Sequence, residues 1–180
     1  MIDMVTVNPR APSGLVGEST RDEAYGVLPG EDRLVRDIMT KKVVVAPSSM
    51  VLREACEIMR LQPAFVLIVC QGDEPVQALV ERDLINDNVS LEEVSERRTL
   101  QELIDHRVAV RCREDAILAD VLRAMIRHRA SHIPVLGSTS NLLGALSLVD
   151  AVGALSPAAA DRWLAHLQGW SAIPPLKSKL

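Results

Sequence analysis

The chain has 180 residues, enough for one large core or two small packed domains, and 48% of them are hydrophobic. A formal charge of −4 and only two tryptophans, one tyrosine and one phenylalanine argue against a nucleic-acid partner, which requires basic and base-stacking surfaces. With no signal-peptide pattern, no membrane-spanning apolar stretch and no closely spaced pair among three cysteines, we expect a cytoplasmic protein with no membrane partner.

The N-terminal residues 1–33 are rich in proline, glycine, serine and acidic residues and show no sustained hydrophobic period. Such composition buries too little apolar surface to order a chain by itself. It predicts a flexible arm with one short element near Glu23–Leu28.

The central part of the chain repeats itself, with units at residues 34–89 and 100–155 and a linker at 90–99. Val69 matches Val135 at an offset of 66 residues, and Asp83 matches Asp150 at an offset of 67. Earlier matches have an offset of 65, so the spacing drifts by only two residues. A repeat this regular predicts one architecture used twice.

Each repeat predicts the order strand, helix, strand, strand, helix, an α/β (α+β) unit. The longer helix of each unit is predicted from apolar residues at i, i+3, i+4 and i+7, namely Leu52, Ala55, Cys56 and Met59, then Leu118, Val121, Leu122 and Met125. Ser49 and Asp115 precede these helices and are the expected N-caps. Because units of about 60 residues bury little surface alone, we expect them to share a core.

The C-terminal part, residues 156–180, predicts one more helix at Pro157–Trp170 and then an extended tail. Both tryptophans of the chain lie in this helix. Its apolar edge either folds back on the repeats or joins two subunits.

The stretches VRDIMTKKVVV, REACEIM, SHIPV and GALSLVD, in this order and duplicated, resemble a tandem pair of CBS domains, also called a Bateman module. The resemblance runs from Val35 to about Leu155. It implies two β-α-β-β-α units packed with pseudo-twofold symmetry, whose clefts bind an adenosyl ligand such as AMP, ADP, ATP or S-adenosylmethionine. It also implies a homodimer that is not an enzyme, uses no cofactor beyond the regulatory nucleotide, and acts on an unidentified regulated protein.

The family motif Gly-x-x-Ser/Thr-x-x-Asp is complete at Gly144, Ser147 and Asp150. A carboxylate can accept hydrogen bonds from both ribose hydroxyls, and a serine can donate to a ribose or phosphate oxygen. The alternative for Ser147 is a simple helix cap. The resemblance adds further residues to the same cleft, namely Asp105, Arg107, Ala109, Ser131, His132 and Pro134.

The first repeat departs from the motif, because its stretch QALVERD places Gln77 at the glycine position and Val80 at the hydroxyl position. Only Asp83 remains. The resemblance therefore implies a weaker second cleft, formed with Lys42 and Val44, and we expect one functional site rather than two.

Other chemistries are less well supported. Ser147, His132 and Asp150 are the residue types of a hydrolase triad, but the chain has no G-x-S-x-G elbow. His128 and His132 have the spacing of zinc ligands on a helix, but the helix should end between them and no third ligand is near in sequence. We expect no catalytic or metal residues. Arg129 occupies the position of a helix-ending glycine, which predicts a left-handed backbone or a different turn. The alternative function is a structural or protein-interaction module whose clefts bind no ligand.

Overall fold

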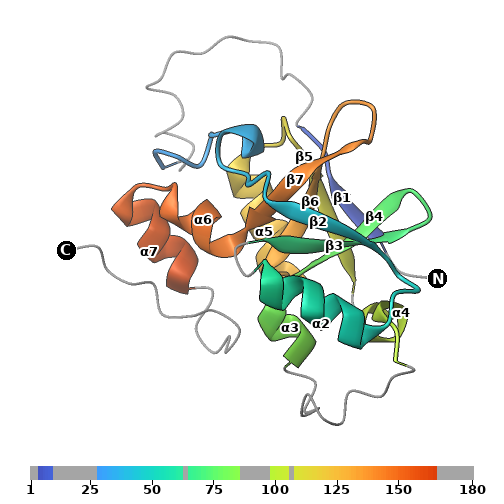
Figure 1. Cartoon of the computed structure of the whole chain (residues 1–180). Helices are drawn as coiled ribbons and strands as arrows, with labels where there is room; N and C mark the ends of the chain where they lie inside the picture. Colours follow the sequence, from blue (N-terminus) through green and yellow to red (C-terminus); the bar gives the residue numbers. More distant parts are fainter. Residues whose placement is uncertain (1–3, 10–27, 63–64, 86–97, 106–107, 166–180) are drawn as a thin grey trace.

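The computed structural model describes residues 4–9, 28–62, 65–85, 98–105 and 108–165, which form two similar units (Figure 1). The first unit contains β2 (Val43–Pro47), α2 (Leu52–Leu61), β3 (Val66–Gln71), β4 (Glu74–Leu79) and α3 (Glu81–Ile85). The second contains β5 (Ala109–Arg113), α5 (Leu118–Arg127), β6 (His132–Leu136), β7 (Leu142–Ser147) and α6 (Leu148–Gly153). The order predicted from the repeat is confirmed in both units.

Each unit has its own sheet, with strand order β2-β3-β4 in the first and β1-β5-β6-β7 in the second. In both units the first strand of the repeat pairs in parallel with the next, which then pairs antiparallel with the third. Val69 pairs with Gln77 and Val135 with Gly144, and each antiparallel ladder has an irregularity directly after its valine. The two sheets therefore have a register irregularity at equivalent positions.

Two short helical elements each lead into one unit but pack on the other. The element η1 (Val35–Asp37) precedes β2 of the first unit and packs on the second unit. Helix α4 (Leu100–Ile104) precedes β5 of the second unit and packs on the first unit. The Val35 N–H donates to the Ala116 carbonyl of the second unit (3.1 Å), and the Leu100 N–H donates to the Met50 carbonyl of the first (2.9 Å). Because these two contacts join equivalent positions of the repeat, the pair has pseudo-twofold symmetry.

The apolar faces of α2 and α5 are buried as their spacing predicts, with Met59 and Met125 fully enclosed. They form two separate cores, one beneath each sheet. A third cluster lies between the sheets and comes from both units, namely Val66, Ile68, Cys70, Ala78 and Ala145. The expected shared core is therefore present at the contact between the two sheets.

The prediction of side-chain caps at Ser49 and Asp115 is wrong, because the residues before α2 and α5 are Val51 and Ile117, which form no side-chain cap. Instead, the caps come from two exchanged segments, residues 28–42 and 98–105, each of which leads into one unit but contacts the other. The first N–H of each helix donates to such a segment at 2.8 Å: Leu52 to the Arg98 carbonyl, and Leu118 to the Arg33 carbonyl. Backbone oxygens from the other half of the chain thus replace the caps.

The composition of residues 1–33 predicts a flexible arm, but part of this segment joins the second unit. Met4–Val7 form β1, which pairs in parallel with β5 at the sheet edge, and the Thr6 hydroxyl accepts a hydrogen bond from Arg111 Nε (2.7 Å). Residues 10–27, with most of the element expected near Glu23–Leu28, lie outside the described residues.

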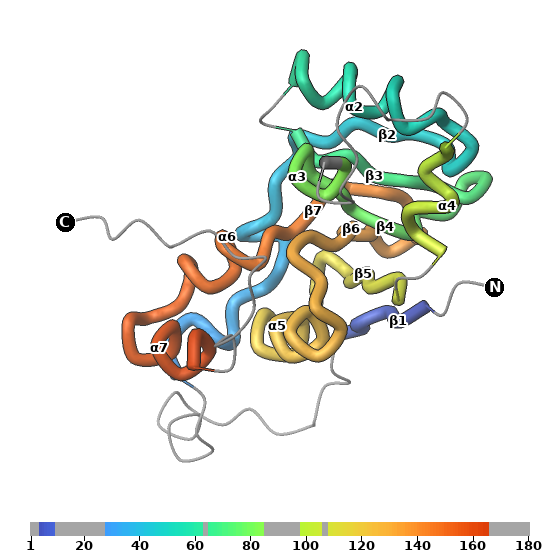
Figure 2. The backbone as a smooth tube through the Cα atoms, turned by 90° about the horizontal axis from the view of Figure 1, so that it is seen from below, coloured from blue at the N-terminus to red at the C-terminus, as the bar shows by residue number. Residues whose placement is uncertain are grey.

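The C-terminal helix α7 (Pro157–Ala165) folds back on the second unit. Its Trp163 is 8% exposed and belongs to the core beneath that sheet. Figure 2 shows α7 beside α6, with the N-terminal segment of residues 28–42 running past both. Residues 166–180 lie outside the described residues. Among the helices that are described, none is long and apolar enough to cross a membrane.

Candidate functional site

The motif of the second unit lies where β7 passes into α6. Ser147 is the N-cap of α6: its hydroxyl oxygen accepts the Asp150 N–H (2.9 Å), and the hydroxyl donates to Asp150 Oδ2 (2.9 Å). Ser147 is 8% exposed, whereas Asp150 is exposed. The capping role considered for the serine is therefore real, and it also holds the Asp150 carboxylate in one place at the start of the helix.

Gly144 has a structural reason to be glycine. A Cβ at this position would lie 2.2 Å from the Thr40 carbonyl oxygen. That approach is fixed by two backbone hydrogen bonds of 2.9 Å between Thr40 and Ala145, one in each direction. The missing side chain thus makes room for the segment leading into the first unit, which pairs with β7 at the edge of the second sheet.

His132 lies at the junction between the two units. It is the first residue of β6 and is paired with Ser147 across the ladder. Burial lowers the pKa of its imidazole, and the nearby Arg82 guanidinium lowers it further, while the carboxylates of Asp83 and Asp150 act in the opposite direction. Its pKa therefore lies below the usual range, although two carboxylates from different units act on the same ring.

The equivalent position in the first unit is built differently. Val80 supplies no hydroxyl, and the Asp83 carboxylate itself accepts the Val80 N–H through Oδ2 (2.9 Å). Asp83 is half-buried, and Gln77 fills the glycine position with a buried polar side chain. The carboxylate that remains in this unit is thus engaged by its own backbone, which distinguishes it from the exposed Asp150.

Four other predicted site residues lie in or directly beside β5, β6 and α4. Ser131 precedes β6, and its hydroxyl lies 3.2 Å from Nδ1 of the adjacent His132. Pro134 and Ala109 are buried within strands. Asp105 ends α4 and accepts a hydrogen bond from Gln101.

Arg107 lies outside the described residues. The side-chain carbonyl of Gln101 also accepts a hydrogen bond from Gln71 (2.8 Å), so Gln101 joins α4 to the end of β3 in the first unit and at the same time holds Asp105.

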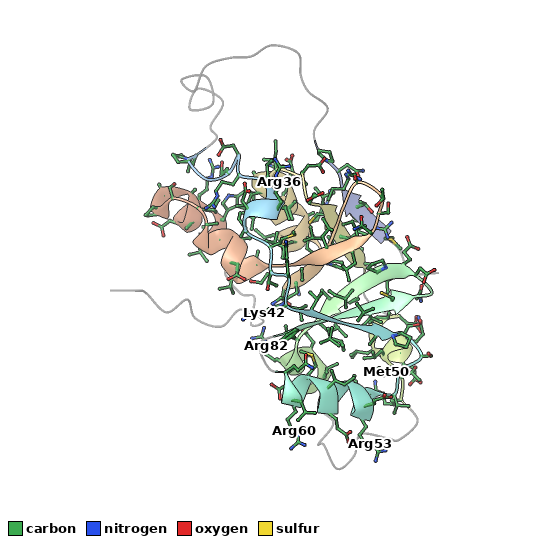
Figure 3. All side chains as sticks on the ribbon, turned by 45° about the horizontal axis from the view of Figure 1, so that its top comes forward. Arg36, Lys42, Met50, Arg53, Arg60 and Arg82 are labelled. Carbon is green, nitrogen blue, oxygen red and sulfur yellow. The ribbon has the colours of Figure 1, made fainter. Side chains whose placement is uncertain are left out.

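Two residues expected in the second cleft, Lys42 and Val44, lie where the segment of residues 28–42 leads into β2. Lys42 is exposed, and its N–H donates to the Thr40 hydroxyl (3.1 Å), whereas Val44 packs into the core of the first unit. In Figure 3, Lys42 and Arg82 are both seen where the two units meet. Sequence reasoning did not single out Arg82, whose guanidinium acts on His132, or Thr40, whose backbone pairs with Ala145 beside the motif. The repeat offset could have found Thr40, because it is equivalent to Asp105.

The geometry does not assemble the alternatives considered from the sequence. The Ser147 hydroxyl hydrogen is directed to Asp150 and not to His132, so the order of a hydrolase triad is not formed. Helix α5 ends at Arg127, before His128, and Arg129 has φ = 53°, which is the left-handed backbone, the first of the two alternatives considered for it. Within the described ranges, no group of three or more His, Cys, Asp or Glu side chains could hold a metal ion.

Comparison with known families agrees with this architecture. The CBS domain model matches the chain twice, at residues 35–89 and 100–157, which together cover well over half of it. The chain therefore belongs to the CBS-domain family and contains a tandem pair of these domains. A comparison with curated protein sequences gave no match.

Solved structures of CBS-pair proteins share the fold at about one-fifth identity. A conserved CBS domain protein, TA0289 from Thermoplasma acidophilum, has a TM-score of 0.59 at 20% identity over 76% of this chain and 77% of that one. The CBS domain pair of protein MJ0100, solved with 5′-methylthioadenosine and S-adenosyl-L-methionine, has a TM-score of 0.51 at 20% identity over 66% and 91%. The cytosolic domain of the Mg²⁺ channel MgtE, solved with ATP, has a TM-score of 0.52 at 20% identity, and the match covers 69% of this chain but half of that one.

Proposed function

We propose that the protein is a regulatory module that binds an adenosyl ligand at the second unit, around Ser147 and Asp150. The observation that carries this proposal is the exposed Asp150 carboxylate, held by Ser147 beside His132 and Ser131. Two structures of the same fold were solved with ligands that contain an adenosyl group. The proposed ligand is therefore a compound that contains an adenosyl group.

The chemistry of the second unit suits a ribose. Asp150 Oδ2 accepts from Ser147, and a carboxylate with about four lone-pair directions retains capacity for two vicinal hydroxyls. Ser131 and His132 add further polar atoms at the start of the adjacent strand. Hydrogen bonds to a charged acceptor are the stronger kind, so Asp150 should contribute more affinity than its neutral neighbours.

The two units should differ in affinity. In the first unit, Asp83 already accepts the Val80 N–H, and a buried Gln77 occupies the position of Gly144. A ligand there would also meet no serine hydroxyl, because Val80 stands at the position of Ser147. We therefore propose one principal site, with a weaker one formed by Lys42, Val44 and Asp83.

The test is calorimetric titration of nucleotide-free protein with AMP, ADP, ATP and S-adenosylmethionine, each separately. For the ligand that binds, Asp150→Ala should cost about 1.5–3 kcal/mol, the range for a hydrogen bond to a charged group, or roughly ten- to a hundredfold in affinity. Asp83→Ala is the matched control and should cost much less. Equal losses, or a larger loss at Asp83, would contradict the assignment of the principal site.

The second candidate is a structural or protein-interaction module, and the observation favouring it is that Ser147 is already occupied as a helix cap. Absence of binding by all four compounds would support it.

With either function we propose a homodimer without enzymatic activity that acts on a partner protein. The free thiols of Cys56, Cys70 and Cys112 suit a reducing cytoplasm. Light scattering at micromolar concentration tests the dimer, and a single-chain mass would contradict it.

A further inference from the structure

A buried carboxylate lies outside the candidate site, at Glu31, which is only 2% exposed. Its Oε2 accepts the Leu28 N–H (2.9 Å), and its Oε1 accepts Trp163 Nε1–H (2.7 Å) and also a hydrogen bond from Arg162. Burial alone would raise the pKa of this carboxyl, but the hydrogen bonds from Arg162, Leu28 and Trp163 outweigh it and lower the pKa. A buried charge with every oxygen paired fixes its partners strongly.

The turn that carries Glu31 is also fitted to the end of α6. The Pro29 carbonyl accepts the Ser156 N–H (3.0 Å), and Arg33 Nη1 donates to the Ala154 carbonyl (3.3 Å). Gly30 has φ = +94°, and a Cβ there would lie 2.9 Å from the Ala154 oxygen. Because the two backbones touch, the turn and the C-terminal end of α6 cannot move independently.

The opposite end of the same short helix carries the candidate site. Helix α6 has six residues, so its two ends are separated by about 9 Å. The N-terminal segment that begins at this turn also reaches β7, where Thr40 bonds to Ala145 in both directions. The segment of residues 28–42 therefore contacts β7 at Ala145 and also the residues directly after α6, at Ala154 and Ser156, and its course past both elements can be followed in Figure 2.

We propose that residues 28–33, together with Arg162 and Trp163 of α7, form a latch that is closed by Glu31 and is coupled through α6 to ligand binding at Asp150. This inference rests on the proposed function. A ligand that fixes the N-terminal end of α6 also fixes its C-terminal end, against which the latch closes. Linkage requires the reverse as well: opening the latch must weaken binding of the ligand. Glu31 is thus a positioning residue for the site and touches no ligand.

The test measures amide hydrogen exchange of α7 in the full chain, without ligand and with saturating ATP or S-adenosylmethionine, whichever binds by calorimetry. In the wild type, ligand should slow exchange in α7 several-fold. Glu31→Gln should speed exchange in the ligand-free protein about tenfold and weaken binding several-fold. Trp163→Phe, which removes the indole donor and makes the ring smaller but keeps an aromatic side chain, should do the same to a smaller degree and serves if Glu31→Gln does not fold.

The control is Glu74→Gln, which removes the charge from another arginine partner, because Glu74 of β4 in the first unit pairs with Arg111 of β5 (2.6 Å), away from α6 and α7. It should leave both α7 exchange and affinity unchanged. Ligand binding with unchanged α7 exchange, or a latch variant that loosens α7 at unchanged affinity, overturns the coupling alone. No binding of any adenosyl ligand overturns the proposed function and the coupling together.

Discussion

Replacing Gly144 by alanine tests whether this glycine serves the fold. The added Cβ would lie 2.2 Å from the Thr40 carbonyl oxygen and 3.2 Å from the Thr40 carbonyl carbon. Both atoms are backbone, so no side chain can rotate away, and the segment must shift. That shift breaks the two 2.9 Å hydrogen bonds between Thr40 and Ala145, in a place where Ala145 is fully buried.

The expected loss follows from these contacts. Two backbone hydrogen bonds contribute about 1 kcal/mol each, and buried groups left unpaired add to this, so Gly144→Ala should lower the free energy of unfolding by about 2–4 kcal/mol. For a chain of this length that corresponds to a fall of roughly 5–10 °C in the melting temperature. Urea denaturation and a thermal melt of the ligand-free protein both measure it.

Gly153 provides the control, since a Cβ there would meet nothing within 4 Å and the residue lies in α6. Gly153→Ala should be neutral or stabilise by up to about 1 kcal/mol, because alanine favours helix. If Gly144→Ala melts with the wild type but binds ligand less well, the glycine would serve ligand approach, and its role in making room for the Thr40 backbone would be refuted.

Three further outcomes follow from the described contacts. Ser147→Ala should cost roughly 0.5–2 kcal/mol in urea denaturation even without ligand, because it removes the cap of α6; an unchanged midpoint would contradict the capping role. The lowered pKa of Glu31 means that its charge stabilises the fold fully above the usual value of 4.5 and that this contribution is lost as the pH falls through the lowered pKa. On acidification below pH 4.5 the wild type should therefore lose more stability than Glu31→Gln, and parallel curves would contradict this. Burial raises the pKa of the Cys112 thiol, so a thiol reagent should modify the half-buried Cys56 first in the native protein, and equal rates would argue against the buried position.

The repeat and its apolar spacing were enough to predict the two units. Side chains such as Met59 and Met125 recur at the same place in each repeat, and helix and strand periods depend mainly on near neighbours in the chain. The same is true of the motif at the end of β7, because Ser147 and Asp150 are three residues apart and meet within one helical turn. Local spacing therefore specified both the elements and the most distinctive part of the candidate site.

The asymmetry between the units was also visible in part. Because Val80 stands where the motif has a hydroxyl, the sequence predicted weaker ligand binding at the cleft of Asp83. Only the folded structure showed that the Asp83 carboxylate accepts a hydrogen bond from the Val80 N–H, since a carboxylate at this spacing could equally have pointed to solvent.

Contacts between distant parts of the chain were decided only by the tertiary structure. The exchanged segments supply backbone oxygens where Ser49 and Asp115 were expected to cap, and a backbone carbonyl has no signature in the side-chain sequence. Glu31 meets Trp163 across 132 positions, and Thr6 meets Arg111 across 105. The composition around Glu31 predicts a solvated arm. Burial of Glu31 becomes favourable only when the second unit is folded, because Arg162 and Trp163 then donate hydrogen bonds to its carboxylate.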